Sequence, residues 1–97
     1  MVVKILTLAS SPSFSAPLLT LGSALFRTNA VADAEREYKA AIAVDPKLGE
    51  AHNNLAVVYL QAGRLVDADR EMKLAEKSGV RINPQFKEDL RKASGRR

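Results

Sequence analysis

The side chains that most often carry chemistry are sparse in this chain. It holds a single histidine, His52, and no cysteine. A zinc site needs several His, Cys or carboxylate ligands, and the sequence does not supply the further ligands that His52 would need. The serine-rich stretch from Ser10 to Ser15 lacks a histidine and an acid placed to activate a nucleophile. The glycines are scattered and form no phosphate-binding loop. We therefore expect no catalytic residue, no metal and no cofactor, and predict that the protein is not an enzyme.

The remaining polar side chains fit structural roles. A lone histidine at a large-residue position favours a packed or half-exposed spacer between helices, which is our interpretation of His52. Acids and bases alternate along two segments of the chain, where neighbours on a helix surface form pairs worth about 0.2–0.5 kcal/mol each. We expect ordinary surface pairs, made by the acids Glu35, Glu37, Asp67, Asp69 and Glu71 with the bases Arg36, Lys39, Arg70 and Lys73.

The composition is that of a small soluble domain with a basic excess. Apolar residues make up 46% of the 97 residues and charged residues 27%, with a formal net charge of +4. The basic excess lies near the C-terminus, in Lys87, Arg91, Lys92, Arg96 and Arg97. Cations in the last turns of a helix complement its dipole and need no ligand. The alternative is an accessory domain that contacts nucleic acid or an acidic partner through this helix and tail.

A 34-residue repeat organises the rest of the chain. Shifted by 34 positions, the segment 31–41 overlies the segment 65–75. Six pairs are identical in that register: Asp33/Asp67, Ala34/Ala68, Arg36/Arg70, Glu37/Glu71, Lys39/Lys73 and Ala41/Ala75. Upstream, Leu21 overlies Leu55 and Leu25 overlies Tyr59, so the register extends over both halves of the repeat.

Apolar spacing within each repeat predicts two helices with a tight turn between them. Gly63 and Asn29 stand at equivalent turn positions, and both residue types tolerate the left-handed backbone conformation. Asp45-Pro46 ends the first repeat, because the residue before proline is pushed out of the helical region. The expected helices are Pro17 to Thr28, Ala30 to Val44, Gly49 to Ala62, Leu65 to Ser78 and Pro84 to Ala93. Small residues are expected where helices cross: Gly22, Ala34, Ala56 and Ala68.

These positions resemble the tetratricopeptide repeat (TPR) family over about two thirds of the chain. The family pattern is a bulky residue, Leu-Gly, Tyr, a turn Gly, Ala, an aromatic, Ala and Pro. Repeat one, 15–48, has Leu18, Leu21, Gly22, Leu25, Asn29, Ala34, Tyr38, Ala41 and Pro46. Repeat two, 49–82, has His52, Leu55, Ala56, Tyr59, Gly63, Ala68, Met72 and Ala75, with Val80 in place of the proline. The resemblance implies an all-α fold, a right-handed solenoid of antiparallel helix pairs with a capping helix.

The resemblance also implies a function in protein–protein interaction, as a scaffold that holds a peptide segment or partner helix in a concave groove. The groove positions carried over from the family are Leu19, Thr20, Ser23, Phe26 and Arg27 in repeat one, and Glu50, Asn53, Asn54, Val57, Leu60 and Gln61 in repeat two. Family members that clamp a C-terminal carboxylate use Lys, Asn and Arg in this groove. Only Asn54 matches that set, while Leu19 and Ser23 replace the expected Lys and Asn, so we expect an apolar segment instead of a carboxylate.

The two ends of the array receive different expectations. Residues 83–94 read as an amphipathic capping helix, begun by Asn83-Pro84, and residues 95–97 as a frayed basic tail. The first helix is apolar around most of its circumference. Two repeats also fall below the three usually needed for stability. Three explanations stay open: a leader, residues 1–14, covers it; two copies pair through it as a homodimer; or the chain ends a longer array. The leader makes a poor signal peptide, so we expect a cytoplasmic protein without a membrane span.

Overall fold

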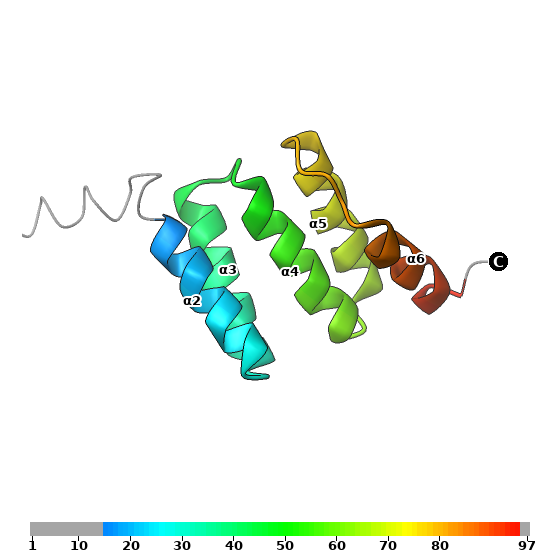
Figure 1. Cartoon of the computed structure of the whole chain (residues 1–97), viewed down its shortest axis with the longest axis horizontal. Helices are drawn as coiled ribbons and strands as arrows, with labels where there is room; N and C mark the ends of the chain where they lie inside the picture. The colour runs from blue at the N-terminus through cyan, green and yellow to red at the C-terminus, as the bar shows by residue number, and fades with distance from the viewer. Residues whose placement is uncertain (1–14, 96–97) are drawn as a thin grey trace, which may run out of the picture. The chain divides into compact units, whose positions relative to one another are not determined.

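The computed structural model describes residues 15–95, and within them the chain is all α-helical. The helices in chain order are α2 (Ser15–Arg27), α3 (Val31–Val44), α4 (Gly49–Gln61), α5 (Leu65–Lys77) and α6 (Pro84–Ala93) (Figure 1). All five predicted helices are confirmed, with bounds that differ by at most two residues. The predicted leader and the last two residues of the predicted basic tail lie outside the described residues. The chain divides into two compact units, 1–48 and 49–97, which we describe one at a time.

The N-terminal unit is an antiparallel pair, α2 against α3, and Gly22 sets how closely the two helices approach. A Cβ atom on Gly22 would lie 2.8 Å from two ring carbons of Tyr38. The Tyr38 ring is itself buried, and its hydroxyl lies 3.1 Å from the Ser23 hydroxyl. On α3, Ala34 and Ala41 lie one helical turn before and after Tyr38, and both are fully buried. The close packing predicted at Gly22 is therefore confirmed, and Ala34 is buried, as its predicted place at a crossing requires.

The turn inside each repeat has the same geometry. Asn29 has a φ of 68° and Gly63 a φ of 78°, both in the left-handed region. The amide of Ala30 donates to the carbonyl of Leu25 at 2.8 Å, and the amide of Arg64 to that of Tyr59 at 2.8 Å. Asn tolerates this conformation better than other residues that have a Cβ atom, which explains why it can stand where the second repeat has glycine.

In the C-terminal unit, α4 packs against α5 and buries more than half of its own residues. The buried apolar residues of this pair are Ala51, Leu55, Ala56, Val58 and Tyr59 on α4, and Ala68, Met72 and Ala75 on α5. Gly49, at the start of α4, lies against the end of α5: a Cβ there would come within 2.6 Å of the Val80 side chain. The small residues again mark the places where backbones approach.

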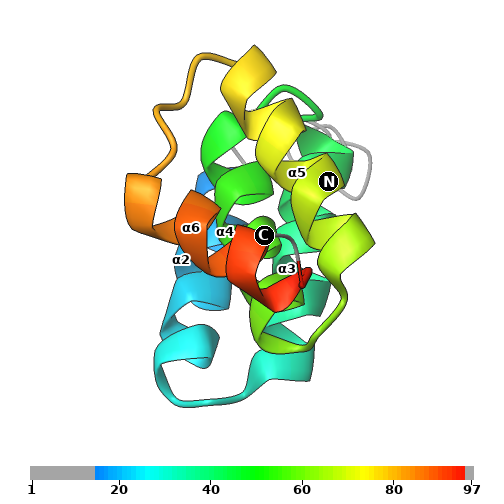
Figure 2. The ribbon, with the colours of Figure 1, turned by 90° about the vertical axis from the view of Figure 1, so that its right-hand side faces the viewer.

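Helix α6 follows an irregular stretch and lies alongside α5 (Figure 2). Asn83 caps it as predicted, because its side-chain oxygen accepts a hydrogen bond from the amide of Gln85 at 2.8 Å, and Pro84 takes the first helical position. Phe86 and Leu90 are buried. Ala93, expected on the same buried face, is instead exposed, because it is the last residue of the helix. Among residues 15–95, no helix has both the length and the apolar composition that crossing a bilayer requires.

The burial of Ala68 leads to a stability test. Ala68 is completely buried at a helix contact, whereas Ala62 is exposed in the turn after α4. Because extra methylenes strain a packed site, Ala68→Leu should lower the free energy of unfolding by about 1–3 kcal/mol. Ala62→Leu adds the same atoms in solvent and should change it by less than about 0.5 kcal/mol. Thermal or urea unfolding measures both, and equal effects would contradict the helix contacts described here.

Candidate functional site

Helix α4 divides sharply into a buried and an accessible face. All six residues predicted to line a groove from repeat two lie on the accessible face, which the helical spacing of 50, 53, 54, 57, 60 and 61 defines. Glu50 and Gln61 are exposed, while Asn53, Asn54, Val57 and Leu60 are half-buried. Every residue of α4 between positions 51 and 59 that lies outside this set is buried. The structure therefore brings these six residues together on one surface.

The five groove residues predicted on α2 also share one helix face. Thr20 and Arg27 are exposed, and Leu19, Ser23 and Phe26 are half-buried. The Ser23 hydroxyl is engaged with Tyr38, so it is less available to a partner than predicted. This set belongs to the N-terminal unit and the α4 set to the C-terminal unit, and each is treated by itself.

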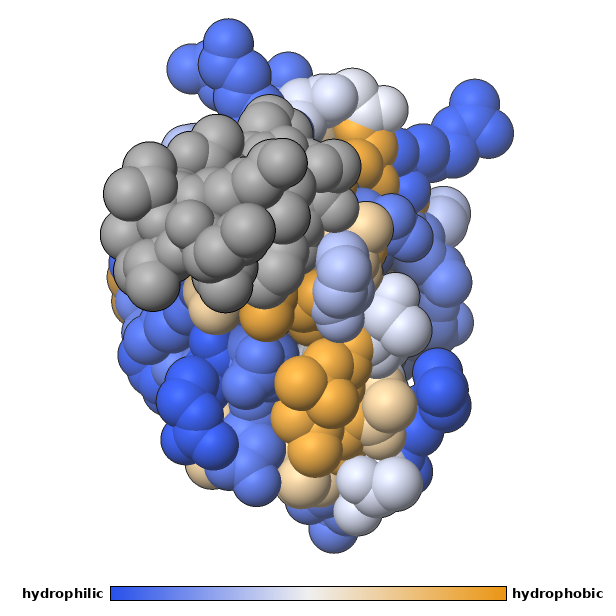
Figure 3. All heavy atoms as spheres, turned by 90° about the vertical axis from the view of Figure 1, so that its left-hand side faces the viewer, coloured by the Kyte–Doolittle hydropathy of each residue, from blue (hydrophilic) through white to orange (hydrophobic). Residues whose placement is uncertain are grey.

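Helix α2 carries more exposed apolar surface than a solvent-facing helix normally does. Leu21 is 46% exposed, and Leu18, Leu25 and Phe26 are only half-buried. Figure 3 shows apolar atoms gathered in a patch among hydrophilic ones. Arg27, in the last turn, is the one charged residue of the helix. Apolar patches of this kind usually mark a contact site.

His52 is buried and forms a polar contact inside the C-terminal unit. Its Nδ1 lies 2.7 Å from Oε1 of Glu71, and the two residues are 5% and 6% exposed. The packed interpretation of His52 is therefore confirmed. The prediction for Glu71 is wrong: it does not make an ordinary surface pair, because it lies on the buried stripe of α5 with Ala68, Met72 and Ala75.

A chain of charged groups leads from this buried pair to the surface. The guanidinium of Arg70 donates to Glu71 at 3.3 Å and to Asp67 at 2.8 Å. Arg64 donates to Asp67 at 3.0 Å, and its guanidinium lies 4.3 Å from the centre of the Tyr59 ring. Desolvation raises the pKa of the Asp67 carboxyl, but hydrogen bonds from Arg70 and Arg64 outweigh it and leave that pKa below its ordinary value. The hydrogen bond to Asp67 likewise raises the pKa of Arg70.

The spacing of α5 contains the signal that would have placed Glu71 correctly. Residues 68, 71, 72 and 75 follow the i, i+3, i+4, i+7 pattern of one helix face. Glu37, the equivalent residue in repeat one, is only half-buried. Repeat one has Leu18 at the position where repeat two has His52. The identity of Glu37 and Glu71 suggested equal roles, whereas only repeat two supplies the histidine.

The His52–Glu71 pair is a structural contact in this geometry. Within residues 15–95, no three His, Cys, Asp or Glu side chains come together in a group that could hold a metal ion. The carboxylate oxygens of Glu71 are taken by His52 and Arg70. The pair joins α4 to α5 inside the unit, so its effect is to fix the register of the two helices that carry the α4 face.

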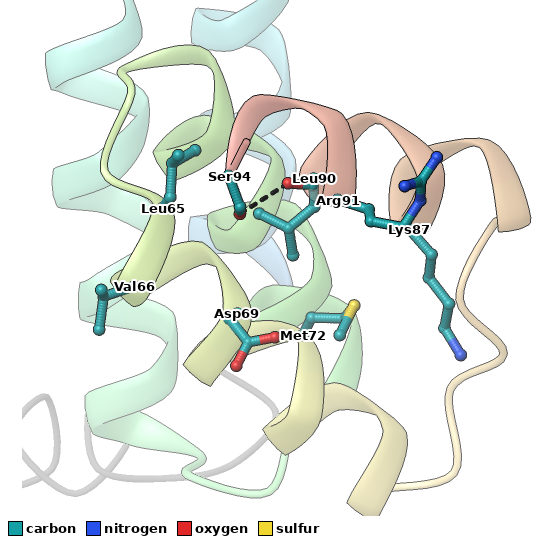
Figure 4. Close-up of a pocket in the computed structure, with 8 residues that line it drawn as sticks. All are labelled: Leu65, Val66, Asp69, Met72, Lys87, Leu90, Arg91 and Ser94. Atoms are coloured by element: carbon teal, nitrogen blue, oxygen red, sulfur yellow. Dashed lines mark hydrogen bonds between the residues drawn. The ribbon is translucent and has the colours of Figure 1, made fainter. Parts of the chain in front are cut away.

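A pocket lies between α5 and α6 in the C-terminal unit (Figure 4). It has a volume of about 530 Å³. Its lining comprises Leu65, Val66, Asp69 and Met72 from α5 and Lys87, Leu90, Arg91 and Ser94 from α6. Sequence analysis did not identify it. Val66 could have indicated the pocket, because it is an apolar residue that lies outside the buried stripe of α5.

Two of the cations of α6 are paired with carboxylates inside the unit. Lys87 pairs with Glu76 of α5 at 2.7 Å, and Arg91 pairs with Glu88 one turn earlier. The hydrogen bond from Arg91 holds the pKa of the Glu88 carboxyl below its ordinary value. Phe86, the aromatic residue of this helix, is buried and offers no stacking surface. The burial of this aromatic ring weighs against base stacking on α6, which the nucleic-acid alternative would use.

The buried pair leads to a test that uses the repeat as its own control. Removing one partner leaves the other polar group buried without its hydrogen bond. We expect His52→Leu to lower the free energy of unfolding by about 1–3 kcal/mol, since it leaves one buried oxygen of Glu71 without its hydrogen-bond partner while Arg70 still contacts the other. Glu37→Gln, at the repeat-one position equivalent to Glu71, removes a carboxylate that has no histidine in the equivalent place and should change the free energy of unfolding by less than about 0.5 kcal/mol. Urea unfolding measures both, and a neutral His52→Leu variant would show that the pair does not hold the helices.

A comparison with protein-family models finds the TPR repeat over residues 22–63. That range runs from Gly22, at the close crossing of α2 and α3, to Gly63, in the turn after α4. No curated protein and no solved structure matches the chain. The five helices, their pairing and their identical turns are consistent with TPR-like repeats. The chain therefore contains tetratricopeptide repeat sequence, carried on an all-α framework of TPR-like helix pairs.

Proposed function

We propose that the chain is a protein-interaction module that binds an apolar peptide segment or partner helix through the first helices of its repeats, α2 and α4. The observation that carries the proposal is the division of α4 into a buried and an accessible face. A helix fixed on one side by packing presents the other side with little loss of conformational freedom on binding. TPR repeats generally mediate protein–protein interaction, which supports the same conclusion.

The accessible face of α4 combines two kinds of side chain that suit a peptide. Val57 and Leu60 offer apolar area in its C-terminal half, and Asn53 and Asn54 have amides that can both donate and accept hydrogen bonds. Glu50 is the charged member of this face. A partner with apolar anchors fits this composition better than a terminal carboxylate does, since the face carries no cation.

The face of α2 supports an apolar partner in the same way. Leu19 and Phe26 are half-buried there, and Leu21 is exposed nearby. In the absence of another protein, a second copy of the chain could occupy this face, so self-association through α2 stays a prediction. Phe26→Asp would place a charge among the apolar residues of this face and should abolish any association that α2 mediates.

Site-specific photo-crosslinking tests the proposed function. A photoreactive residue at Val57 or at Phe26 should capture a partner protein, and one at Lys39, on the exposed surface of α3, should not. The captured protein would then be purified and titrated against the unmodified chain. Equal capture from all three positions would contradict a defined binding face.

Variants of the chain give the quantitative prediction. Val57→Asp should raise the dissociation constant for the purified partner at least about tenfold, because it buries a charge against apolar anchors. Leu74→Asp is the matched control, since Leu74 is an exposed apolar residue of α5 outside the proposed faces. Calorimetric titration and a melting curve of each variant separate lost binding from lost folding. Equal weakening by both variants would place the partner elsewhere.

A further inference from the structure

The C-terminal unit has a strongly exposed apolar side chain next to a pocket. Val66 is 82% exposed, the most exposed large apolar side chain among the described residues. It stands at the edge of the pocket between α5 and α6, whose floor includes the buried side chains of Met72 and Leu90 (Figure 4). We call the eight lining residues given above the α5–α6 surface. It lies wholly within one unit and shares no residue with the proposed faces of α2 and α4.

The charges of the α5–α6 surface are separated by helix. Asp69 contributes a carboxylate on the α5 side, and Lys87 and Arg91 contribute cations on the α6 side. Each already has a partner in its own chain: Lys73 for Asp69, Glu76 for Lys87 and Glu88 for Arg91. Those pairs are between about two fifths and seven tenths exposed, and such pairs are worth about 0–1 kcal/mol. They can therefore be exchanged for contacts with another molecule at small cost.

A surface with this pattern is complementary to itself. In a two-fold interface every contact from one chain to the other occurs twice, so the surface must hold both halves of each contact. The α5–α6 surface does so: it has the exposed Val66 and the pocket, and it has the acidic α5 side and the basic α6 side. A partner other than a second copy would need only one member of each contact: either the projecting side chain or the pocket, and either the acidic or the basic side.

We propose that two copies of this chain associate through the α5–α6 surface about a two-fold axis. Val66 of each copy enters the pocket of the other, and Asp69 of each faces Lys87 and Arg91 of the other. The surface is small, so the dimer is expected to be weak, with a dissociation constant in the micromolar to millimolar range. This association is independent of the proposed function, because it leaves the faces of α2 and α4 outside the interface.

Sedimentation equilibrium of the full chain is the first test. Over a range from about 10 μM to about 1 mM, the average mass should rise from that of one chain towards that of two. Val66→Asp should raise the dissociation constant at least about tenfold. It should not harm the fold, because Val66 lies in the first turn of α5, where an acid complements the helix dipole. Leu74→Asp, on the same helix but outside the surface, should leave the dissociation constant unchanged.

Charge reversal identifies the second copy as the occupant. Asp69→Lys sets a cation against the partner's cations, and Lys87→Glu combined with Arg91→Glu sets acids against the partner's acid, so each variant chain alone should associate at least about tenfold more weakly. Mixed together, the two variants should associate again, because both cross-chain contacts then join opposite charges. The variant that carries all three substitutions in one chain should also recover.

Several outcomes would overturn the proposal. A wild-type chain that stays monomeric over the whole concentration range would do so. So would association that Phe26→Asp abolishes and Val66→Asp leaves intact, since α2 would then be the interface. Failure of the mixed charge variants to associate, with each still folded by circular dichroism, would show that the surface meets some other segment. Partner capture at Val57 is measured separately, so the two proposals fail independently.

Discussion

Close approach between paired helices is the constraint on which the rest of this structure depends. The Tyr38 ring fills the space that a side chain at position 22 would occupy, with 2.8 Å between its carbons and an added Cβ. Alanines at positions 34, 56 and 68 are completely buried in the same role. Because these residues leave room for neighbouring backbones, a short chain can bury one side of each helix. The opposite sides then remain available.

One-sided burial is also what makes a binding function reasonable for so small a chain. Helix α4 has seven buried residues out of 13 and still keeps a continuous accessible face. The interior contact between His52 and Glu71 fixes α4 against α5 through a directional hydrogen bond, whereas apolar packing alone is non-directional. A rigid face loses less entropy when it binds, so the core polar pair supports the surface without touching a partner.

Much of this architecture could be predicted from the repeat, since Gly63, Asn29 and Pro46 punctuate the chain and small residues mark the crossings. What escaped prediction depends on the pairing of side chains that are far apart in sequence. Glu71 and Glu37 are equivalent in the repeat, but only Glu71 contacts a histidine, His52. The residue pattern of α5 alone cannot predict a contact with a residue on α4. The pocket beside Val66 could not be predicted for a related reason. It forms between α5 and α6, and the irregular stretch that joins these helices does not reveal from the sequence how they pack. Ala93 shows the limit at a helix end, where the pattern continues but the covering element does not.

Nuclear magnetic resonance tests residue by residue whether the chain binds proteins through the accessible faces of α2 and α4, as we propose. An isotope-labelled chain would be titrated with the purified partner while backbone amide shifts are followed. The account predicts that the largest changes fall at positions 50, 53, 54, 57, 60 and 61 of α4 and at 19, 20, 23, 26 and 27 of α2. Changes concentrated on α3 or on the outer side of α5, with those positions unaffected, would contradict it.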